Sequence, residues 1–340
     1  MSTDLLPSPT SSPLRRLTGV QIVGTGSYVP EQVVTNEALA SLGCDADWII
    51  QRTGIRERRH APPEISTSDM AVAAAERCIK SADVDRSQID LVVLATLSPD
   101  YLLPATATAV QDRLGLNCAA MDLSAACAGF MYAMVTGMQF VATGSSNMAL
   151  VIGADTNSRV MNPDDKKTFP LFGDGAGAVL VTKGSNEQGL ISYTLGADGS
   201  GTGLLIRPAG GSRMPLNGSG AMGPDWFVKM DGRPVFKWAV RLLEDSTRQV
   251  LDAAGCTTDD VKLWLLHQAN IRILDAAADA LAIDRSKMET HIDRYGNTSA
   301  GSVPIALDEA LAARRFGRGD LLLMCGFGGG LSWGTALLRW

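Results

Sequence analysis

Hydrophobic residues form short runs separated by longer amphipathic stretches. The runs are VQIVG (20–24), LVVLAT (91–96), MALVIG (148–153) and AVLVT (178–182), then LISYTL (190–195), LWLL (263–266), LLLMCG (321–326) and TALL (335–338). Their length and their β-branched residues predict buried strands. The stretches between them have a period near 3.6 and polar starts, such as Thr67, Ser68 and Asp69 before MAVAAAERCIKSA, which predict helices. This alternation predicts an α/β protein.

The second half of the pattern resembles the first. Four landmarks recur at an offset of 172 or 173 residues: Gly24 and Gly196, Ile89 and Val261, Ala128-Gly129 and Ala300-Gly301, Gly153 and Gly326. Four matches in one order indicate an internal duplication. We therefore expect an N-terminal half at 18–184 and a C-terminal half at 185–340, after a flexible tail at 1–17.

Composition excludes several classes of protein. With 340 residues and 46% hydrophobic content, the chain can bury a large core of about two domains. The net charge is -6 and no basic block occurs, so nucleic acid is not an expected partner. No run approaches the roughly 20 apolar residues of a membrane span. Six cysteines without a C-x-x-C pair predict a reducing, cytoplasmic location, with an organelle transit segment as the alternative for the Ser- and Pro-rich start.

Glycine-rich segments and histidines do not indicate a cofactor. In Gly24-Thr25-Gly26 the third small residue of a dinucleotide fingerprint would be Val29, so that motif fails. FGDGAGA (172–178) and FGGG (327–330) lack the Lys-Ser/Thr ending of a P-loop, and predict sharp turns or close backbone approach. His60, His267 and His291 have no partner at metal-ligand spacing. We expect no metal and no bound cofactor.

Cys127 is the candidate nucleophile. The strand CAAMDL runs into the turn Ser124 to Ala126, and a helix is expected to begin near Cys127. A helix N-terminus favours thiolate over thiol by about 0.3–1 kcal/mol, and by up to ~2 kcal/mol when partly buried. The small residues Ala128 and Gly129 would let this helix lie deep in the protein. The alternative for an isolated cysteine is a buried structural side chain.

Two residues of the second half favour the catalytic interpretation. His267 follows the strand VKLWLL, and Asn297 lies in YGNTSAG, where the duplication places the partner of the Cys127 turn. If the halves pack about a pseudo-twofold axis, Cys127 and Asn297 come from equivalent turns and His267 lies at the neighbouring strand end. Alone, His267 would be a half-buried histidine and Asn297 a helix cap.

These residues stand in motifs that resemble the β-ketoacyl-acyl carrier protein synthases III of the thiolase superfamily. The motifs are GTGSYVPEQVVTN, DWIIQRTGIRER, AACAGF, FGDGAGA, HQANIRI, GNTSAGSVPIALDEA and FGGGLSWGTALLRW. The resemblance covers residues 17–340 and implies a five-layer αβαβα fold of two duplicated halves, a homodimer, and Cys127, His267 and Asn297 as the catalytic triad. It implies an acyltransferase that begins fatty acid biosynthesis. Acyl-coenzyme A (acyl-CoA) loads the cysteine, and malonyl-acyl carrier protein (malonyl-ACP) condenses with the acyl group as it loses carbon dioxide.

Roles for the other site residues follow from the same resemblance. An oxyanion would bind to the backbone amides of Cys127 and Gly329. The residues expected to hold coenzyme A or the carrier protein are Trp48, Arg52, Lys166, Lys237 and Arg272, and those expected near the primer pocket are Leu103, Thr156, Asn157 and Phe172. Leu103 replaces a common aromatic residue, Thr156 and Asn157 replace apolar ones, and Asp275 and Asp279 lie where a Lys is common. The identity of the acyl primer is therefore not determined by the sequence. The positive charge expected on the surface that docks the carrier protein is reduced.

Three other functions compete with this interpretation. A specialised condensing or acyl-transferring enzyme of secondary metabolism could keep Cys127, His267 and Asn297 and use another second substrate. A cysteine hydrolase is suggested by the order Cys, His, Asn, with His267 140 residues after Cys127, although a papain-like cysteine signature is missing. A non-catalytic binding protein is the third alternative, and the complete triad argues against it.

Overall fold

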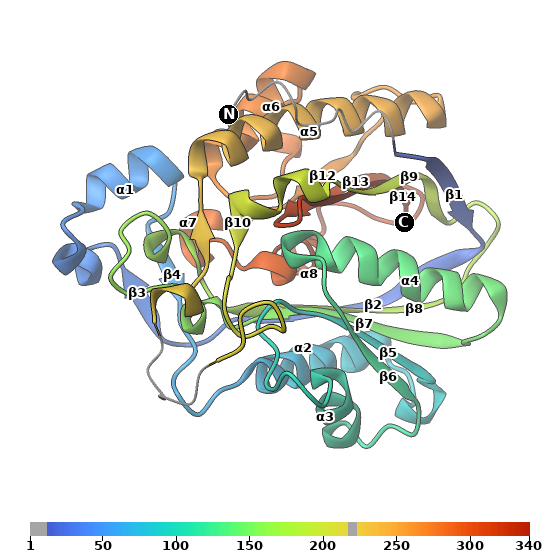
Figure 1. Cartoon of the computed structure of the whole chain (residues 1–340). Coiled ribbons are helices and arrows are strands. Elements are labelled where there is room, and N and C mark those ends of the chain that lie inside the picture. The colour runs from blue at the N-terminus through green and yellow to red at the C-terminus, as the bar shows by residue number, and fades with distance from the viewer. Residues whose placement is uncertain (1–11, 217–222) are drawn as a thin grey trace.

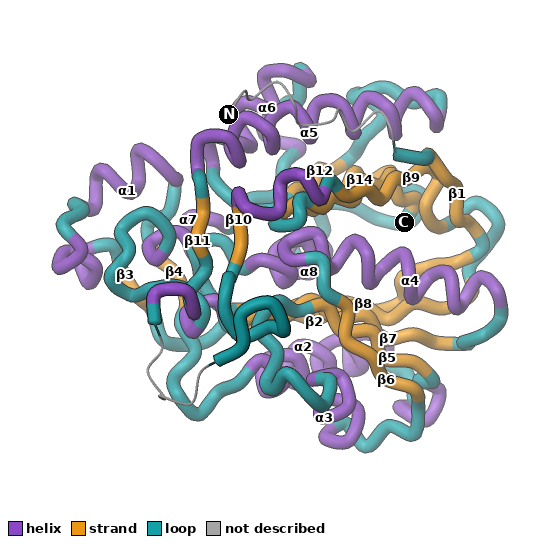
Figure 2. Tube along the Cα trace, viewed as in Figure 1, coloured by secondary structure: helices purple, strands orange, loops and turns teal. Residues whose placement is uncertain are grey.

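The computed structural model describes residues 12–216 and 223–340, which fold into five layers of helices and sheets (Figures 1 and 2). The first sheet has the order β2 (Val20–Tyr28), β8 (Gly175–Lys183), β7 (Met148–Asp155), β5 (Leu91–Ala95) and β6 (Ala119–Leu123). The second has the order β1 (Leu14–Thr18), β9 (Gly189–Ala197), β14 (Ser332–Arg339), β13 (Leu321–Gly328) and β12 (Leu263–Leu266). All the strands expected from hydrophobic runs are present.

The two sheets repeat one topology. The order β2-β8-β7-β5 in the first sheet matches β9-β14-β13-β12 in the second, and each of these four-strand orders consists of two antiparallel pairs followed by one parallel pair. Each sheet has one further strand, β6 or β1, at opposite ends of this common order. The five-layer fold of two duplicated halves is confirmed.

The helices form three of the five layers. Between the sheets lie α4 (Gly129–Thr143) and α8 (Ser302–Ala312), whose apolar residues join the core of both sheets. The outer layers are α2 (Thr67–Ala82) and α3 (Thr106–Arg113) on the first sheet, and α5 (Gly232–Ala254) and α6 (Ile271–Leu281) on the second. The stretch Ala126–Thr143 has the length and hydropathy of a membrane span, but 61% of it is buried, as expected of a core helix.

The start of the chain differs from the expected tail. Residues 1–11 of that tail lie outside the described residues, but Leu14–Thr18 form β1, antiparallel to β9. Leu17 is buried in the core between the sheets, whereas Arg15 and Arg16 face outward. The segment LRRLT has too few apolar residues for a periodic pattern to reveal a strand. It becomes a strand because it pairs with β9. These residues thus precede the first half in sequence but belong to the second sheet.

Short elements gather at one end of the sheets (Figures 1 and 2), and several of their residues line the cavity described below. They are β3 (Val33–Thr35), α1 (Ala46–Thr53), β4 (Glu57–Arg59), β10 (Leu205–Ile206), β11 (Lys229–Met230) and α7 (Ile292–Tyr295). Glycines in the segment FGDGAGA let these short elements pack closely together. A side chain at Gly173 would approach the carbonyl oxygen of Tyr295 to 2.1 Å, so only glycine lets the segment FGDGAGA lie against the end of α7.

Candidate active site

Cys127 lies where the two halves of the protein meet. It is in the 3₁₀ turn Ala126–Ala128, directly before α4, and an equivalent turn, Ser299–Gly301, precedes α8. Ala126 and Ser299 have the same unusual backbone conformation, with φ of 47° and 51°. The two turns pack against each other and bury Cys127. A helix therefore begins at Cys127 as expected, but deep inside the protein.

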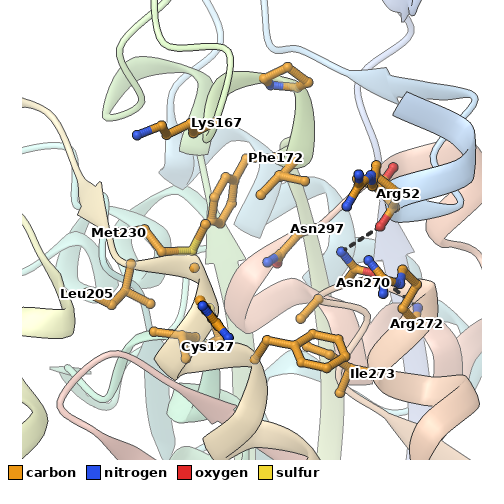
Figure 3. Close-up of a pocket in the computed structure, with 18 of the residues that line it drawn as sticks. Arg52, Cys127, Lys167, Phe172, Leu205, Met230, Asn270, Arg272, Ile273 and Asn297 are labelled. Carbon is orange, nitrogen blue, oxygen red and sulfur yellow. Dashed lines mark hydrogen bonds between the residues drawn. The ribbon is translucent and has the colours of Figure 1, made fainter. Parts of the chain in front are cut away.

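A cavity of about 670 Å³ brings the three expected catalytic residues together. Cys127, His267 and Asn297 all line it, although they are far apart in the sequence. Figure 3 shows Cys127 and Asn297 at this cavity with Phe172, with Leu205 and Met230 on one side and Arg52, Asn270 and Arg272 on the other. The three residues thus meet as expected, and their catalytic roles stay predictions.

The Asn297 amide has a defined orientation. Its Oδ1 accepts a hydrogen bond from the Ser299 backbone N–H at 2.8 Å, so its Nδ2 is the group left to donate into the cavity. Its main chain is held as well, because Asn297 N–H donates to Leu171 at 2.8 Å and its carbonyl accepts from Gly173 at 3.0 Å. Asn297 lies two residues before the positive-φ residue Ser299, rather than at the position equivalent to Cys127.

His267 is a buried, neutral imidazole. It follows β12, its backbone N–H donates to the Cys325 carbonyl at 2.8 Å, and its ring packs edge-to-face on Phe327 at 5.1 Å. Burial, together with the nearby His291, lowers the pKa of His267 to about 3. A neutral imidazole can donate a hydrogen bond from one ring nitrogen and accept a proton at the other.

The state of the Cys127 thiol differs from the expected thiolate. Burial raises the pKa of Cys127 to about 12, the Ser299 hydroxyl opposes this rise only in part, and the buried Asp155 carboxylate adds to it. From the ordinary value of 9.0 this rise corresponds to ~4 kcal/mol, more than the ~2 kcal/mol that a helix N-terminus supplies at most. Desolvation therefore outweighs the helix, and Cys127 is a neutral thiol near pH 7.

We expect alkylation of Cys127 by iodoacetamide to become about tenfold faster per pH unit through the neutral range, without a plateau below pH 9. The reason is that the thiolate fraction grows with pH until the pH reaches the raised pKa of Cys127. Mass spectrometry of the Cys127 peptide, with the more exposed Cys118 as an internal comparison, measures the rate. A plateau between pH 6 and 8 would show that the thiolate is already present and that the helix dominates.

Gly328 packs closely against Cys127. A Cβ on Gly328 would lie 2.8 Å from the Cys127 nitrogen and 2.9 Å from its Cβ, so glycine is required for this approach. Gly328 lines the cavity, whereas Gly329 is absent from its wall and packs beside Leu205. The structure thus places the FGGG turn beside Cys127, as expected, and the role of the Gly329 amide in binding an oxyanion stays a prediction.

The mouth of the cavity is cationic. All five residues expected to hold coenzyme A or the carrier protein line it: Trp48, Arg52, Lys166, Lys237 and Arg272. Lys167 and Arg233 add two further cations, and no acidic residue occurs among the described residues of the wall. Arg233 was missed because the sequence gives no signal that the start of α5 reaches the mouth.

Aromatic rings and ion pairs shape this mouth. The Arg52 guanidinium lies 5.9 Å from the Trp48 ring centre, and the Arg272 guanidinium lies 5.7 Å from that of Phe236. Asn270 links the start of α6 to α1, because its Nδ2 donates to the Arg52 carbonyl at 3.1 Å (Figure 3). Asp275, expected to weaken the docking surface, forms an ion pair with Arg285, so its charge is largely compensated.

The four residues expected near the primer pocket do not share one cavity. Phe172 lines the Cys127 cavity and forms a β-bridge with Asn297. Thr156 lines a second cavity of about 700 Å³, where its hydroxyl contacts that of Thr67 at 2.6 Å. Asn157 is fully buried and donates to Gly173, while Leu103 is 87% exposed in the single chain. Neither Asn157 nor Leu103 lines either cavity.

Comparison with known proteins identifies the family. Residues 121–199 match 3-oxoacyl-[acyl-carrier-protein (ACP)] synthase III, and residues 251–340 match its C-terminal domain. A β-ketoacyl-[acyl-carrier-protein] synthase III of Rhodopirellula baltica is 51% identical over 342 residues, covering 95% of this chain and 99% of the relative. The chain belongs to the β-ketoacyl-ACP synthase III family. It is therefore an acyltransferase, a condensing enzyme of the type that initiates fatty acid biosynthesis.

Solved structures of the synthase III family have the same fold. The synthase III of Aquifex aeolicus superposes with a TM-score of 0.87 at 41% identity, covering 95% of this chain and all of that one. A priming β-ketosynthase of the R1128 polyketide pathway gives the same TM-score at 34% identity, covering 95% of this chain and 97% of that one. Membership of the synthase III family removes the papain-like hydrolase as an interpretation of the triad.

Proposed function

We propose that the protein transfers an acyl primer from acyl-CoA to Cys127 and condenses it with malonyl-ACP. The observation that carries this proposal is the convergence of Cys127, His267 and the Asn297 amide in one cavity with a cationic mouth. Beyond these substrates the reaction needs no cofactor and no metal. In the described part of the chain, no group of three His, Cys, Asp or Glu is arranged to hold a metal ion.

In the first half-reaction, the Cys127 sulfur attacks the thioester carbonyl of acyl-CoA. The sulfur–carbon bond to Cys127 forms, the bond to coenzyme A breaks, and the thiol proton finally leaves on the coenzyme A sulfur. Because Cys127 is a neutral thiol, its proton needs an acceptor. The imidazole of His267 lines the same cavity and is the group placed to take this proton, although the lowered pKa of His267 makes it a weak base. Backbone amides at Cys127 and the FGGG turn would bind the oxyanion.

In the second half-reaction, malonyl-ACP loses carbon dioxide. The carbon–carbon bond to the carboxylate breaks and leaves an enolate, whose oxygen accepts hydrogen bonds from His267 and Asn297 Nδ2. Neutral donors suit this oxygen, since they stabilise negative charge without giving up a full proton. The enolate carbon then attacks the acyl-Cys127 carbonyl, and the bond from that carbon to the Cys127 sulfur breaks. The β-ketoacyl product leaves, and the released Cys127 thiolate takes up one proton from solvent.

The mouth residues fit the phosphates and adenine of coenzyme A and an acidic carrier protein. Guanidinium groups bind phosphate oxygens in pairs, which suits Arg52, Arg233 and Arg272. Trp48, which is 44% exposed, offers a stacking face for adenine. Coenzyme A and the carrier protein as substrates, together with free cysteines, agree with a cytoplasmic location.

We expect the protein to be a homodimer at micromolar concentration. Tyr101, Leu102 and Leu103 are 66%, 82% and 87% exposed, and three adjacent large apolar side chains favour burial against a second copy. Multi-angle light scattering measures the mass, and Leu103→Asp should shift it toward the monomer. A monodisperse wild-type monomer would contradict the dimer.

Product analysis tests the proposed function. With acyl-CoA and malonyl-ACP, we expect β-ketoacyl-ACP and one carbon dioxide per product. The similarity to a priming β-ketosynthase of the R1128 polyketide pathway supports a second candidate, a specialised condensing or acyl-transferring enzyme of secondary metabolism with another second substrate. A different acyl product in place of β-ketoacyl-ACP would favour that candidate, and free acid as the main product would contradict both.

A further inference from the structure

Arg58, on β4, is a cation buried in the interior. Its side chain is fully buried, and it donates to the Val34 carbonyl at 3.0 Å, Asn36 Oδ1 at 2.7 Å and the Pro170 carbonyl at 2.9 Å. These acceptors are two backbone carbonyls and an amide oxygen, none of them a carboxylate. Burial lowers the pKa of Arg58 to about 10, so it stays charged at neutral pH. A buried charge held by neutral acceptors is costly and calls for a specific reason.

On one side, Arg58 supports the two segments that hold Asn297. The Pro170 carbonyl lies in the 3₁₀ turn Phe169–Leu171, and the next residue, Phe172, forms the β-bridge with Asn297. The aliphatic part of Arg58 packs on both segments as well. Its Cβ would lie 3.2 Å from a Cβ added at Gly173 or at Gly296, the glycines beside the two bridge residues.

On its other side, Arg58 supports the segment that carries the mouth residues. Asn36, which accepts from Arg58, donates through Nδ2 to the Ile55 carbonyl at 2.8 Å and so closes the loop 36–55 at its base. This loop contains α1, with Trp48 and Arg52. Arg58 therefore lies at the junction of the mouth loop and the bridge to Asn297.

We propose that Arg58 is a positioning residue for the condensation half-reaction, because it fixes the turn Phe169–Leu171 and, through the bridge at Phe172, the direction of the Asn297 amide. Arg58 does not line the cavity, so it acts without touching substrate. Arginine is required because its planar fork serves three acceptors at once, which the single ammonium of lysine cannot do in the same geometry. This proposal rests on the proposed function of Asn297.

The proposal predicts that Arg58→Lys damages one half-reaction selectively. We expect kcat for carbon dioxide release at saturating malonyl-ACP to fall between about tenfold and a hundredfold, because a small displacement of a positioned donor has effects of that size. Acylation of Cys127 by an acyl-N-acetylcysteamine thioester, which lacks the nucleotide, should stay within about threefold of wild type. The matched control is Arg56→Met on the same segment, where the side chain is exposed, and it should leave both rates unchanged.

Asn36→Ser removes one acceptor and should show the same selective loss more weakly, so it keeps the test valid if Arg58→Lys does not fold. Equal losses in both half-reactions, or unchanged carbon dioxide release in folded Arg58→Lys, would overturn the role of Arg58. A wild-type protein that neither forms acyl-Cys127 nor releases carbon dioxide would instead overturn the proposed function, and this proposal with it. The two failures are therefore distinguishable.

Discussion

Replacing Cys127 with alanine should abolish acyl-enzyme and lower primer transfer by at least about ten-thousandfold, because no other nucleophile can take its place. Loss of a catalytic nucleophile has effects of that size in other enzymes that work through a covalent intermediate. Transfer of radiolabelled acyl groups from acyl-CoA to protein measures the loss.

The same variant separates the two half-reactions. Cys127→Ala leaves His267 and the oriented Asn297 amide in the cavity, so carbon dioxide release from malonyl-ACP should persist. The small side chain should also leave the fold intact, which an unfolding curve checks. Primer transfer at the wild-type rate in Cys127→Ala would show that another residue is the nucleophile.

Replacing His267 with alanine should lower carbon dioxide release about a hundredfold or more, because the enolate loses a donor worth ~3 kcal/mol. Acylation should fall as well. The sequence, by contrast, predicts a thiol that the helix N-terminus activates by itself. Since burial keeps Cys127 protonated, the loss of His267 also removes the expected proton acceptor.

Asn297→Ala is the matched variant for His267→Ala. It removes an enolate donor but no proton acceptor, so carbon dioxide release should fall while acylation remains near the wild-type rate. Both rates are measured on each variant, with radiolabelled primer and with labelled malonyl-ACP. Full acylation in His267→Ala would mean that thiol activation does not depend on this histidine.

Much of the fold could be predicted from the sequence, because its main signals are local or repeated. Buried strands give apolar runs, and a duplication gives the same landmarks twice, so one argument brought Cys127, His267 and Asn297 to one site. The strand Leu14–Thr18 escaped this reasoning, since its pairing partner lies about 175 residues further along the chain.

Properties set by burial could not be predicted. The helix N-terminus at Cys127 is visible in the sequence, but the burial that outweighs it comes from tertiary packing against the turn Ser299–Gly301, and the charge of Asp155 raises the pKa of Cys127 further. The burial of Arg58 could not be predicted for the same reason. In RTGIRERR it is one charged residue among several, and only the packed structure shows that it is fully buried while Arg56 is exposed.

The central claim is that Cys127 carries the acyl group between the two half-reactions. Mass spectrometry of the intact protein and of its Cys127 peptide, after acyl-CoA and again after malonyl-ACP, tests it directly. We expect one acyl group per chain on Cys127, which disappears on addition of malonyl-ACP as an equal amount of β-ketoacyl-ACP forms. An unmodified Cys127 while β-ketoacyl-ACP accumulates, or an acyl-Cys127 that only hydrolyses, would contradict the account.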